Sequence, residues 1–397
     1  VSVGQGERLS NRVPFAVDSL PETLEQEPNN TPPNAQPVAL PVIVNGRIER
    51  PGDCDVFRFA GRAGDVLVAE VTARRLDSPL DSVLRLTDAR GAPLAFNDDH
   101  EDKASGLNTH HADSYLRVTL PADGACYVHL GDAQRQGGAE FAYRLRLGPP
   151  QPDFALRVVP ASVFARGGAT VPLTVFALRI DGFTNAITLA LKDAPEGFTL
   201  SGARVPAGQD QVRLTLTAPL VPLAEPCSLN LEGRAVIQGR AVVRPAVPAE
   251  DMMQAFAYRH LVPAQELQVA VSGRGPGRGA MRIFSPLPVK IPAGGTARLV
   301  VGLPPNPRQG RLQLELSEPP EGLSLKSVAP AGLGTEIVLQ SDAAKMKPGL
   351  AGNLIVSAFA APANPNAKAP NAKARANPRR IQVATLPAIP FEIVRSR

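Results

Sequence analysis

The chain contains no tryptophan, and aromatic residues make up only 5% of its 397 residues. Proteins that bind single-stranded nucleic acid usually stack bases on aromatic side chains, and this chain can build few such platforms. Its Arg and Lys residues are scattered along alternating segments with few aromatics between them. We therefore expect no nucleic-acid partner, and cores built from aliphatic side chains.

Cysteine is also scarce, because the chain has only Cys54, Cys126 and Cys227. Three cysteines cannot form a disulfide framework, and none of them has the spacing of a CxxC motif or of a zinc site. A single bridge between Cys54 and Cys126 and a pair of free, buried thiols both stay open as interpretations.

Long apolar runs are missing as well. No apolar stretch approaches 18 residues, so we expect no membrane-spanning helix. Glycine (34 residues) and proline (41 residues) interrupt the chain too often for long helices. Hydrophobic residues nevertheless reach 44% and are rich in Val, Leu and Ala. This composition predicts an all-β chain of short strands joined by turns.

The first third of the chain shows the alternation of apolar and polar residues that is typical of half-buried strands. The expected strands are 42–48, 55–59, 66–71, 82–86, 115–120, 126–130 and 143–147. They predict an antiparallel, jelly-roll-like β-sandwich of seven or eight strands.

The rest of the chain contains an internal repeat. Gly167-Gly-Ala-Thr170 is followed 127 residues later by Gly294-Gly-Thr-Ala297, and Pro206-Ala-Gly208 is followed 124 residues later by Pro330-Ala-Gly332. Between these pairs, the segment 189–197 corresponds to 314–322 at an offset of 125. Because order and spacing both persist, we expect two copies of one immunoglobulin-like β-sandwich. Residues 249–258, at the junction of the copies, could form a helix or a strand.

These patterns divide the chain into four parts. Residues 1–18 are expected to be a linker and the remnant strand of an upstream domain, and 19–150 the first sandwich. Residues 151–272 are the first repeat with its junction, and 273–397 are the second repeat, with a basic low-complexity loop at 361–378. Charge follows the same division, since 18–150 carry a net −7 and 151–397 a net +11.

An acidic segment precedes the strands of the first sandwich. In an extended chain the side chains of Glu25, Glu27 and Asn29 project to one side, and Asn30 adds another oxygen. Asp53 and Asp55 stand at the start of a predicted strand that a turn could bring beside them. Calcium prefers six to eight oxygen ligands, so this set predicts a calcium site.

Several motifs of the first third resemble the bacterial pre-peptidase C-terminal domain family. They are Glu25-x-Glu27-Pro-Asn29-Asn30-Thr31, then Gly46-x-Ile48, then Gly52-Asp-x-Asp-Val-Phe-Arg-Phe59, and finally Pro121-Ala-Asp-Gly-x-x-Tyr-Val128. The resemblance covers about residues 20–148. It implies a β-sandwich of a secreted protein, often beside a peptidase, that is similar to the collagen-binding domains of clostridial collagenases.

In those collagen-binding relatives an acidic linker and aspartates before the next strand supply calcium ligands. The resemblance carries that role to Glu25, Glu27, Asn29, Asn30 and Asp55. This chain departs from the pattern because Asn30 replaces a carboxylate and because only Asp53 and Asp55 stand where the relatives have more aspartates. Fewer charges predict a weak site, with Kd of about 10⁻⁴–10⁻³ M.

A second acidic group occupies the loops around residues 79–114. A second calcium site would use Asp81, Asp98, Asp99 and Asp113, whereas a zinc site would use His100, His110 and His111. A solvated acidic loop is the third interpretation.

Catalytic motifs are absent from the sequence: there is no GxSxG and no HExxH. We therefore expect no enzyme activity, but a calcium-stabilised extracellular binding or spacer module of a secreted, periplasmic or cell-surface protein. Its partner would be an extracellular protein or polysaccharide, or an associated peptidase domain. The alternative is the C-terminal accessory region of a secreted peptidase whose catalytic domain lies upstream of residue 1.

Overall fold

A computed structural model of the chain describes all residues except 3, 7, 12, 101–111, 255–257, 275–280, 304–311, 333, 361–381 and 397. The chain divides into two compact units. Unit 1 comprises Val1–Asp153, Ile180–Gly182 and Met253–His260, and unit 2 comprises Phe154–Arg179, Phe183–Met252 and Leu261–Arg397.

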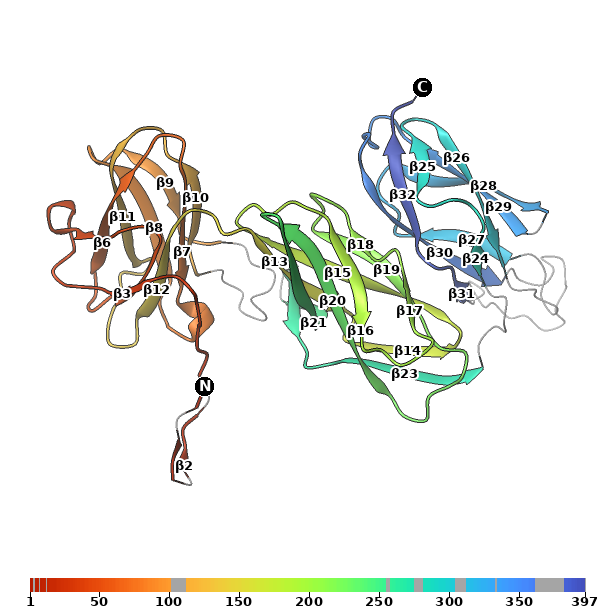
Figure 1. Cartoon of the computed structure of the whole chain (residues 1–397), viewed down its shortest axis with the longest axis horizontal. Coiled ribbons are helices and arrows are strands. Elements are labelled where there is room, and N and C mark those ends of the chain that lie inside the picture. The colour runs from red at the N-terminus through yellow and green to blue at the C-terminus, as the bar shows by residue number, and fades with distance from the viewer. Residues whose placement is uncertain are drawn as a thin grey trace, which may run out of the picture. The chain divides into compact units, whose positions relative to one another are not determined.

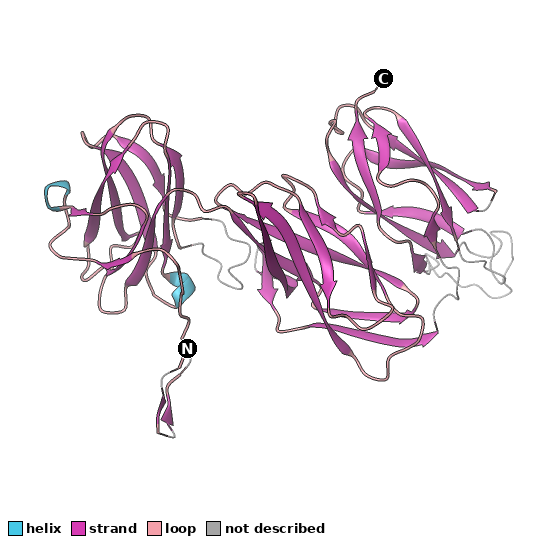
Figure 2. Ribbon diagram, in the orientation of Figure 1, coloured by secondary structure: helices cyan, strands magenta, loops and turns pink. Residues whose placement is uncertain are grey.

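The predicted all-β sandwich fold is confirmed. Among the described residues the regular structure is strands, apart from two short 3₁₀ turns, η1 (Pro32–Asn34) and η2 (Arg74–Leu76), as Figure 2 shows. No helix in these ranges is long and apolar enough to cross a membrane.

Unit 1 contains a sandwich of two five-stranded sheets (Figure 1). The first sheet has the strand order β10 (Tyr115–Thr119), β7 (Val66–Thr72), β12 (Ala142–Gly148), β5 (Val42–Arg47) and β3 (Glu22–Leu24). The second has the order β4 (Gln36–Pro37), β6 (Cys54–Gly61), β11 (Gly124–Asp132), β8 (Ser82–Asp88) and β9 (Pro93–Asn97). Neighbours pair antiparallel except β3 with β5 and β4 with β6, which are parallel.

The two sheets enclose an aliphatic core, as the shortage of aromatics predicts. Alternate residues of β11, namely Cys126, Val128 and Leu130, are buried, whereas the residues between them are partly exposed. This period of two is what a strand with one face on a core requires. Phe57 and Phe59 are the aromatic members of this otherwise mainly aliphatic cluster, together with Tyr143.

Three strands of this sandwich are not among those expected from the sequence. β3 and β4 fall in what looks like a polar linker, and β9 begins at Pro93. All three lie at sheet edges, where short strands depend on a partner strand and not on their own pattern. Two of them, β3 and β4, flank the acidic segment.

The N-terminal residues lie before these sheets. β1 (Gly4–Gln5) and β2 (Arg8–Leu9) pair with each other as a separate two-stranded sheet. Val13, Phe15 and Val17 belong to no strand, and their side chains are exposed.

Unit 2 holds two hydrophobic cores, one built from residues 154–271 and the other from residues 281–393. Around the first core one hydrogen-bonded path runs through eight strands. In order they are β14 (Ser162–Gly167), β23 (Leu267–Arg274), β20 (Cys227–Ile237), β21 (Arg240–Gln254), β13 (Asp153–Val159), β15 (Thr170–Ile180), β19 (Gln211–Thr217) and β17 (Thr199–Ser201). β16 (Ile187–Lys192) pairs with β20 and β18 (Arg204–Val205), and β22 (Tyr258–Pro263) pairs with β21.

The second core of unit 2 lies between a four-stranded and a five-stranded sheet. The first has the order β24 (Arg282–Ile283), β26 (Thr296–Gly302), β29 (Gly334–Ser341) and β28 (Leu323–Ala331). The second has the order β25 (Val289–Pro292), β32 (Ile389–Val394), β30 (Ala351–Ala360) and β27 (Leu312–Ser317), with β31 (Gln382–Thr385) also on β30.

The basic loop 361–378 lies outside the described residues. Two questions left open by the sequence, the junction at 249–258 and the state of the cysteines, have structural answers. Residues 249–254 continue the long strand β21, so the strand alternative holds there. All three cysteines are free thiols. Cys54 pairs with Gly131 whereas Cys126 pairs with Phe59, so the two residues lie at different ends of the β6–β11 ladder.

Candidate metal centre

The acidic segment enters the sandwich as an edge strand. β3 pairs in parallel with residues 43–45 of β5, and the next residue, Glu25, donates its backbone N–H to the carbonyl of Asn45 at 2.9 Å. In such an extended chain alternate side chains point the same way. The side chain of Leu24 is therefore exposed, while that of Glu25 turns towards the sandwich.

Asp55 reaches the same place from the other sheet. It lies on β6 and is fully buried, and the N–H of its neighbour Val56 donates to the carbonyl of Asn29 at 3.0 Å. This backbone bond ties the end of the acidic segment to β6. Residues from both sheets of the sandwich thus meet at its edge.

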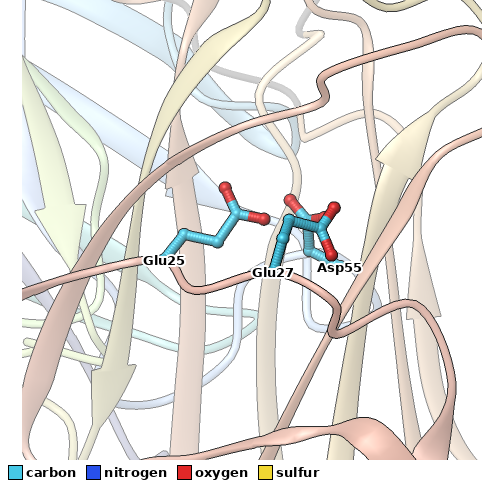
Figure 3. A group of neighbouring side chains, drawn as sticks. All are labelled: Glu25, Glu27 and Asp55. Carbon is cyan, nitrogen blue, oxygen red and sulfur yellow. The ribbon is translucent and has the colours of Figure 1, made fainter.

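Three carboxylates gather at this point. One oxygen from each of Glu25, Glu27 and Asp55 lies within 4.8 Å of the others. Figure 3 shows the three side chains together, with Glu25 and Glu27 on one stretch of chain. In the described part of the chain this is the one cluster of His, Cys, Asp and Glu close enough to hold a metal ion.

Asn29 is a buried neutral residue that contacts two of these carboxylates. Its side-chain amide donates to Glu25 Oε1 at 3.1 Å, and its backbone N–H donates to Glu27 Oε2 at 2.7 Å. These bonds leave the oxygen, Asn29 Oδ1, buried and without a hydrogen bond from the described residues. Asp55 Oδ1 is in the same condition. A buried oxygen without a donor is costly, and a cation bound at the carboxylates is one way to satisfy such an oxygen.

Tyr143 and Gly46 shape the wall behind the carboxylates. The buried hydroxyl of Tyr143 donates to Asp55 Oδ2 at 2.6 Å. Gly46 lies on the neighbouring strand β5, where an added Cβ would overlap that hydroxyl and lie 2.6 Å from Glu25 Oε2. Only a residue without a side chain lets Tyr143 and Glu25 approach this closely.

The electrostatics of the cluster disfavour its charged form. Burial, and then the charge of Glu25, raise the pKa of Asp55 to about 9, although the Tyr143 hydrogen bond acts in the opposite direction. Partial burial and the charges of Asp53, Glu25 and Glu49 raise the pKa of Glu27, against the hydrogen bond from Asn29. Burial and the charge of Asp55 raise the pKa of Tyr143.

In the described part of the chain no arginine or lysine is paired with these carboxylates. Among the described ion pairs, none includes Glu25, Glu27, Asp53 or Asp55. Carboxylates held together without a positive partner raise one another's pKa values until a proton or a cation neutralises them.

Asn30 and Asp53 lie beside the cluster. The side-chain amide of Asn30 donates to Asp53 Oδ1, and the backbone N–H of Glu49 donates to Asp53 Oδ2 at 2.9 Å. Both oxygens of Asp53 therefore already accept hydrogen bonds. The structure brings Glu25, Glu27, Asn29 and Asp55 together and puts Asn30 and Asp53 next to them.

The second acidic group is arranged differently. Asp113 accepts hydrogen bonds from the backbone N–H groups of residues 73, 74 and 75 and from Nε of Arg75, at 2.7–3.2 Å. Asp98 and Asp99 are exposed, and Asp81 is not grouped with them within ligand distance in the described ranges. The ring of His100 lies 4.7 Å from that of Tyr115, whereas His110 and His111 lie outside the described residues.

The donors of the first cluster fit a hard cation such as calcium. They are carboxylate and amide oxygens, which calcium prefers, and the cluster contains neither the thiolate nor the imidazole that zinc favours. Three carboxylates and Asn29 Oδ1 would supply part of the six to eight oxygens required. Asn29 Oδ1 and Asp55 Oδ1, which lack hydrogen-bond donors among the described residues, support this fit independently of the charge of the carboxylates.

Three supporting residues were not predicted from the sequence as part of the site. Tyr143 lies 88 positions after Asp55, and Gln36, whose side-chain amide bonds the backbone of Leu24 and Gln26, lies in the linker, so neither carries a local signal. Gly46 belongs to the motif Gly46-x-Ile48, but its role becomes visible only once its neighbours are known.

Comparison with known proteins gives a partial match. Over 107 residues the chain is 38% identical to a probable subtilase-type serine protease of Deinococcus radiodurans. The match covers 26% of this chain and 14% of that protein's length. No protein-family model matches the chain. A marsupial T cell receptor aligns with 52% of this chain and 91% of its own chain, at 11% identity and a TM-score of 0.18.

Proposed function

We propose that the chain is a non-catalytic, calcium-stabilised extracellular module that binds or spaces parts of a secreted or cell-surface protein. The observation that carries this proposal is the cluster of Glu25, Glu27, Asn29 and Asp55, with two buried oxygens that lack donors. A calcium ion there would neutralise the carboxylates and join the acidic segment to β6.

The weakness expected of the site supports an extracellular location. Only three carboxylates meet, and calcium sites of extracellular modules work at about 10⁻⁴–10⁻³ M. The ligands are also those that the resemblance to pre-peptidase C-terminal domains assigns, apart from Asn30. We include membership of the pre-peptidase C-terminal domain family in the proposal. It is supported by that resemblance and by the partial match to a subtilase-type protease.

The same match favours a second candidate, the accessory region of a secreted subtilase-type peptidase. The matched residues make up a small part of that relative, so its activity is not carried over to this chain. The two candidates share the calcium site and differ in what the module is attached to. Intact-mass analysis and N-terminal sequencing of the natural secreted product would separate them: a peptidase domain on the same polypeptide favours the accessory role, and a product beginning near Val1 favours the independent module.

Calcium-dependent stability tests the proposal on the full chain. Calcium at 100 times Kd should stabilise the folded state by about 2.7 kcal/mol. For a unit of this size that corresponds to a rise in melting temperature of about 5–10 °C. Calorimetry with calcium and with EDTA measures this difference.

The variant Asp55→Asn removes one charge and keeps the acceptor for Tyr143. We expect it to lose most of the calcium-dependent rise and to leave the stability of the metal-free protein nearly unchanged, because burial raises the pKa of Asp55 to about 9 and the carboxyl is therefore neutral at pH 7 without metal. Asp65→Asn, an exposed carboxylate of the same sandwich, is the matched control and should keep the full rise. An unchanged rise in Asp55→Asn, or no rise in the wild type, would refute the calcium site.

A further inference from the structure

Gln36 is a buried polar side chain, at 8% exposure, in a segment whose residues 31–34 and 37 are exposed. It opens β4, where it pairs with Phe57 of β6, two positions after Asp55. Its side chain points towards the acidic segment. Oε1 accepts the backbone N–H of Gln26 at 2.9 Å, and Nε2 donates to the carbonyl of Leu24 at 3.0 Å.

These two bonds bracket Glu25. A side-chain amide that accepts from residue 26 and donates to residue 24 occupies the place of a neighbouring strand. On the opposite edge the segment is held by β5, through the bond from Glu25 N–H to the carbonyl of Asn45 at 2.9 Å. The backbone around Glu25 is therefore fixed from both sides, while its carboxylate accepts hydrogen bonds from the backbone N–H of Arg47 at 2.7 Å and from the side-chain amide of Asn29 at 3.1 Å.

Gln36 also connects the two sheets at this point. The acidic segment belongs to the sheet of β5, whereas β4 and Asp55 belong to the sheet of β6. Because Gln36 is neutral, it links the two sheets here without placing a positive charge beside Glu25 and Asp55.

We propose that Gln36 is the positioning residue of the metal centre, and that it holds Glu25 against Asp55 before any cation binds. This inference rests on the proposed calcium site. Residues that orient metal ligands from behind typically change affinity 10- to 100-fold when they are replaced, because the unbound ligands then have to be ordered on binding.

The test compares the wild-type 397-residue chain with Gln36→Met, which has a similar length and neither hydrogen bond. Terbium replaces calcium as the probe, since the chain has no tryptophan and four tyrosines, and Tyr143 donates to Asp55 directly behind the site. Tyrosine-excited terbium luminescence, with calcium competition, should give an affinity 10- to 100-fold weaker in Gln36→Met.

A second readout needs no metal. In EDTA, deuterium exchange of a peptide spanning residues 22–31 should be faster in Gln36→Met than in the wild type. The control Ser82→Ala changes a residue of β8, another strand of the same sandwich. It removes a fully buried hydroxyl that donates to the carbonyl of Ala112 at 2.8 Å. It should lower the melting temperature yet change neither the terbium affinity nor the exchange of residues 22–31.

The outcomes separate this inference from the proposed function. If terbium affinity or deuterium exchange is unchanged in Gln36→Met, the positioning role is overturned while the calcium site stands. The same conclusion follows if Ser82→Ala changes terbium affinity and exchange as much as Gln36→Met does. If the wild type binds neither ion, the calcium site falls. In that case faster exchange in Gln36→Met still supports Gln36 as the residue that holds Glu25, and unchanged exchange overturns that as well.

Discussion

Asp55 illustrates how much the neighbours of a single residue decide. On the sequence it is one of 37 acidic residues, yet in the fold it is fully buried, beside Glu25 and Glu27. Most acidic residues stay in water because a buried, unpaired carboxylate is costly. Here Tyr143 donates to one oxygen of Asp55, while the other lacks a donor among the described residues.

Gly46 gives a prediction at the same scale. Gly46→Ala should destabilise the metal-free protein by about 1–3 kcal/mol, because the new Cβ overlaps Tyr143 and displaces Glu25. It should also weaken terbium binding. Gly131→Ala is the matched strand control, since its Cβ would lie 3.5 Å from the carbonyl of Asp53, an ordinary contact. Denaturant titration and terbium luminescence measure both effects, and equal losses in the two variants would contradict the assignment of Gly46.

His129 provides a pH dependence that is independent of the metal centre. Burial, and then the charge of Arg85, lower its pKa from 6.5 to about 4, and its ring lies 3.1 Å from the hydroxyl of Thr87. Between pH 6.5 and 4 the unfolded chain binds a proton at this residue that the folded chain does not. The stability contribution is therefore fully present above pH 6.5 and is lost as the pH falls to about 4.

The variant His129→Gln should consequently show a smaller loss of stability between pH 6.5 and 4 than the wild type. Chemical denaturation at a series of pH values in EDTA measures it. Parallel pH profiles for the two proteins would mean that His129 does not contribute.

At the scale of elements, the turn η2 depends on one carboxylate. Asp113 binds three successive backbone N–H groups and the Arg75 side chain, which in turn contacts Glu70 at 3.1 Å. The sequence predicts a metal ligand for Asp113 because charge density cannot distinguish a ligand from an anchor of backbone amides. Arg75 neutralises Asp113 and Glu70 here, whereas among the described residues no arginine or lysine is paired with the carboxylates of the first cluster.

Replacing this anchor should therefore affect stability and leave metal binding unchanged. Asp113→Ala should cost at least about 2 kcal/mol, because it leaves buried amide donors and Arg75 without their acceptor. Asp65→Ala, at an exposed position, should cost much less. Urea denaturation with and without calcium gives both quantities. If Asp113→Ala kept its stability and lost calcium binding, Asp113 would instead be a metal ligand.

The strands themselves show where the prediction from sequence succeeds. Seven expected strands of the first sandwich appear with ends that differ by a few residues, for example β8 at Ser82–Asp88 against the expected 82–86. The alternation is a local property of the chain, so it can be read locally. The edge strands β3 and β4 cannot be predicted in this way, because they are strands only through their hydrogen bonds to β5 and β6.

At the scale of the whole molecule, the proposed metal centre lies in one of two units. All four clustered residues lie in Val1–Asp153, and unit 2 contains two further cores with no group of metal ligands among its described residues. Calcium should therefore stabilise one part of the chain selectively.

Calorimetry of the full chain should show this as two transitions, of which calcium raises only that of unit 1. Limited proteolysis followed by mass spectrometry during heating assigns each transition to its residues. Asp55→Asn should leave the transition of unit 2 where it is in the wild type. A calcium-dependent shift of the unit 2 transition alone would contradict the location of the site.

The sequence by itself determined the all-β class, most strands of the first sandwich and the set of acidic residues from which a calcium site could be chosen. It could do so because strand alternation and the spacing of Glu25, Glu27 and Asn29 are local. Only the tertiary structure decided that Asp55 joins them, that Asn30 and Asp53 lie beside the cluster, and that Asp113 holds a turn instead. Those outcomes depend on contacts such as Tyr143 with Asp55, 88 residues apart, and Asp113 with Ala73, 40 residues apart. Packing of the two sheets creates such contacts, and no local pattern encodes them.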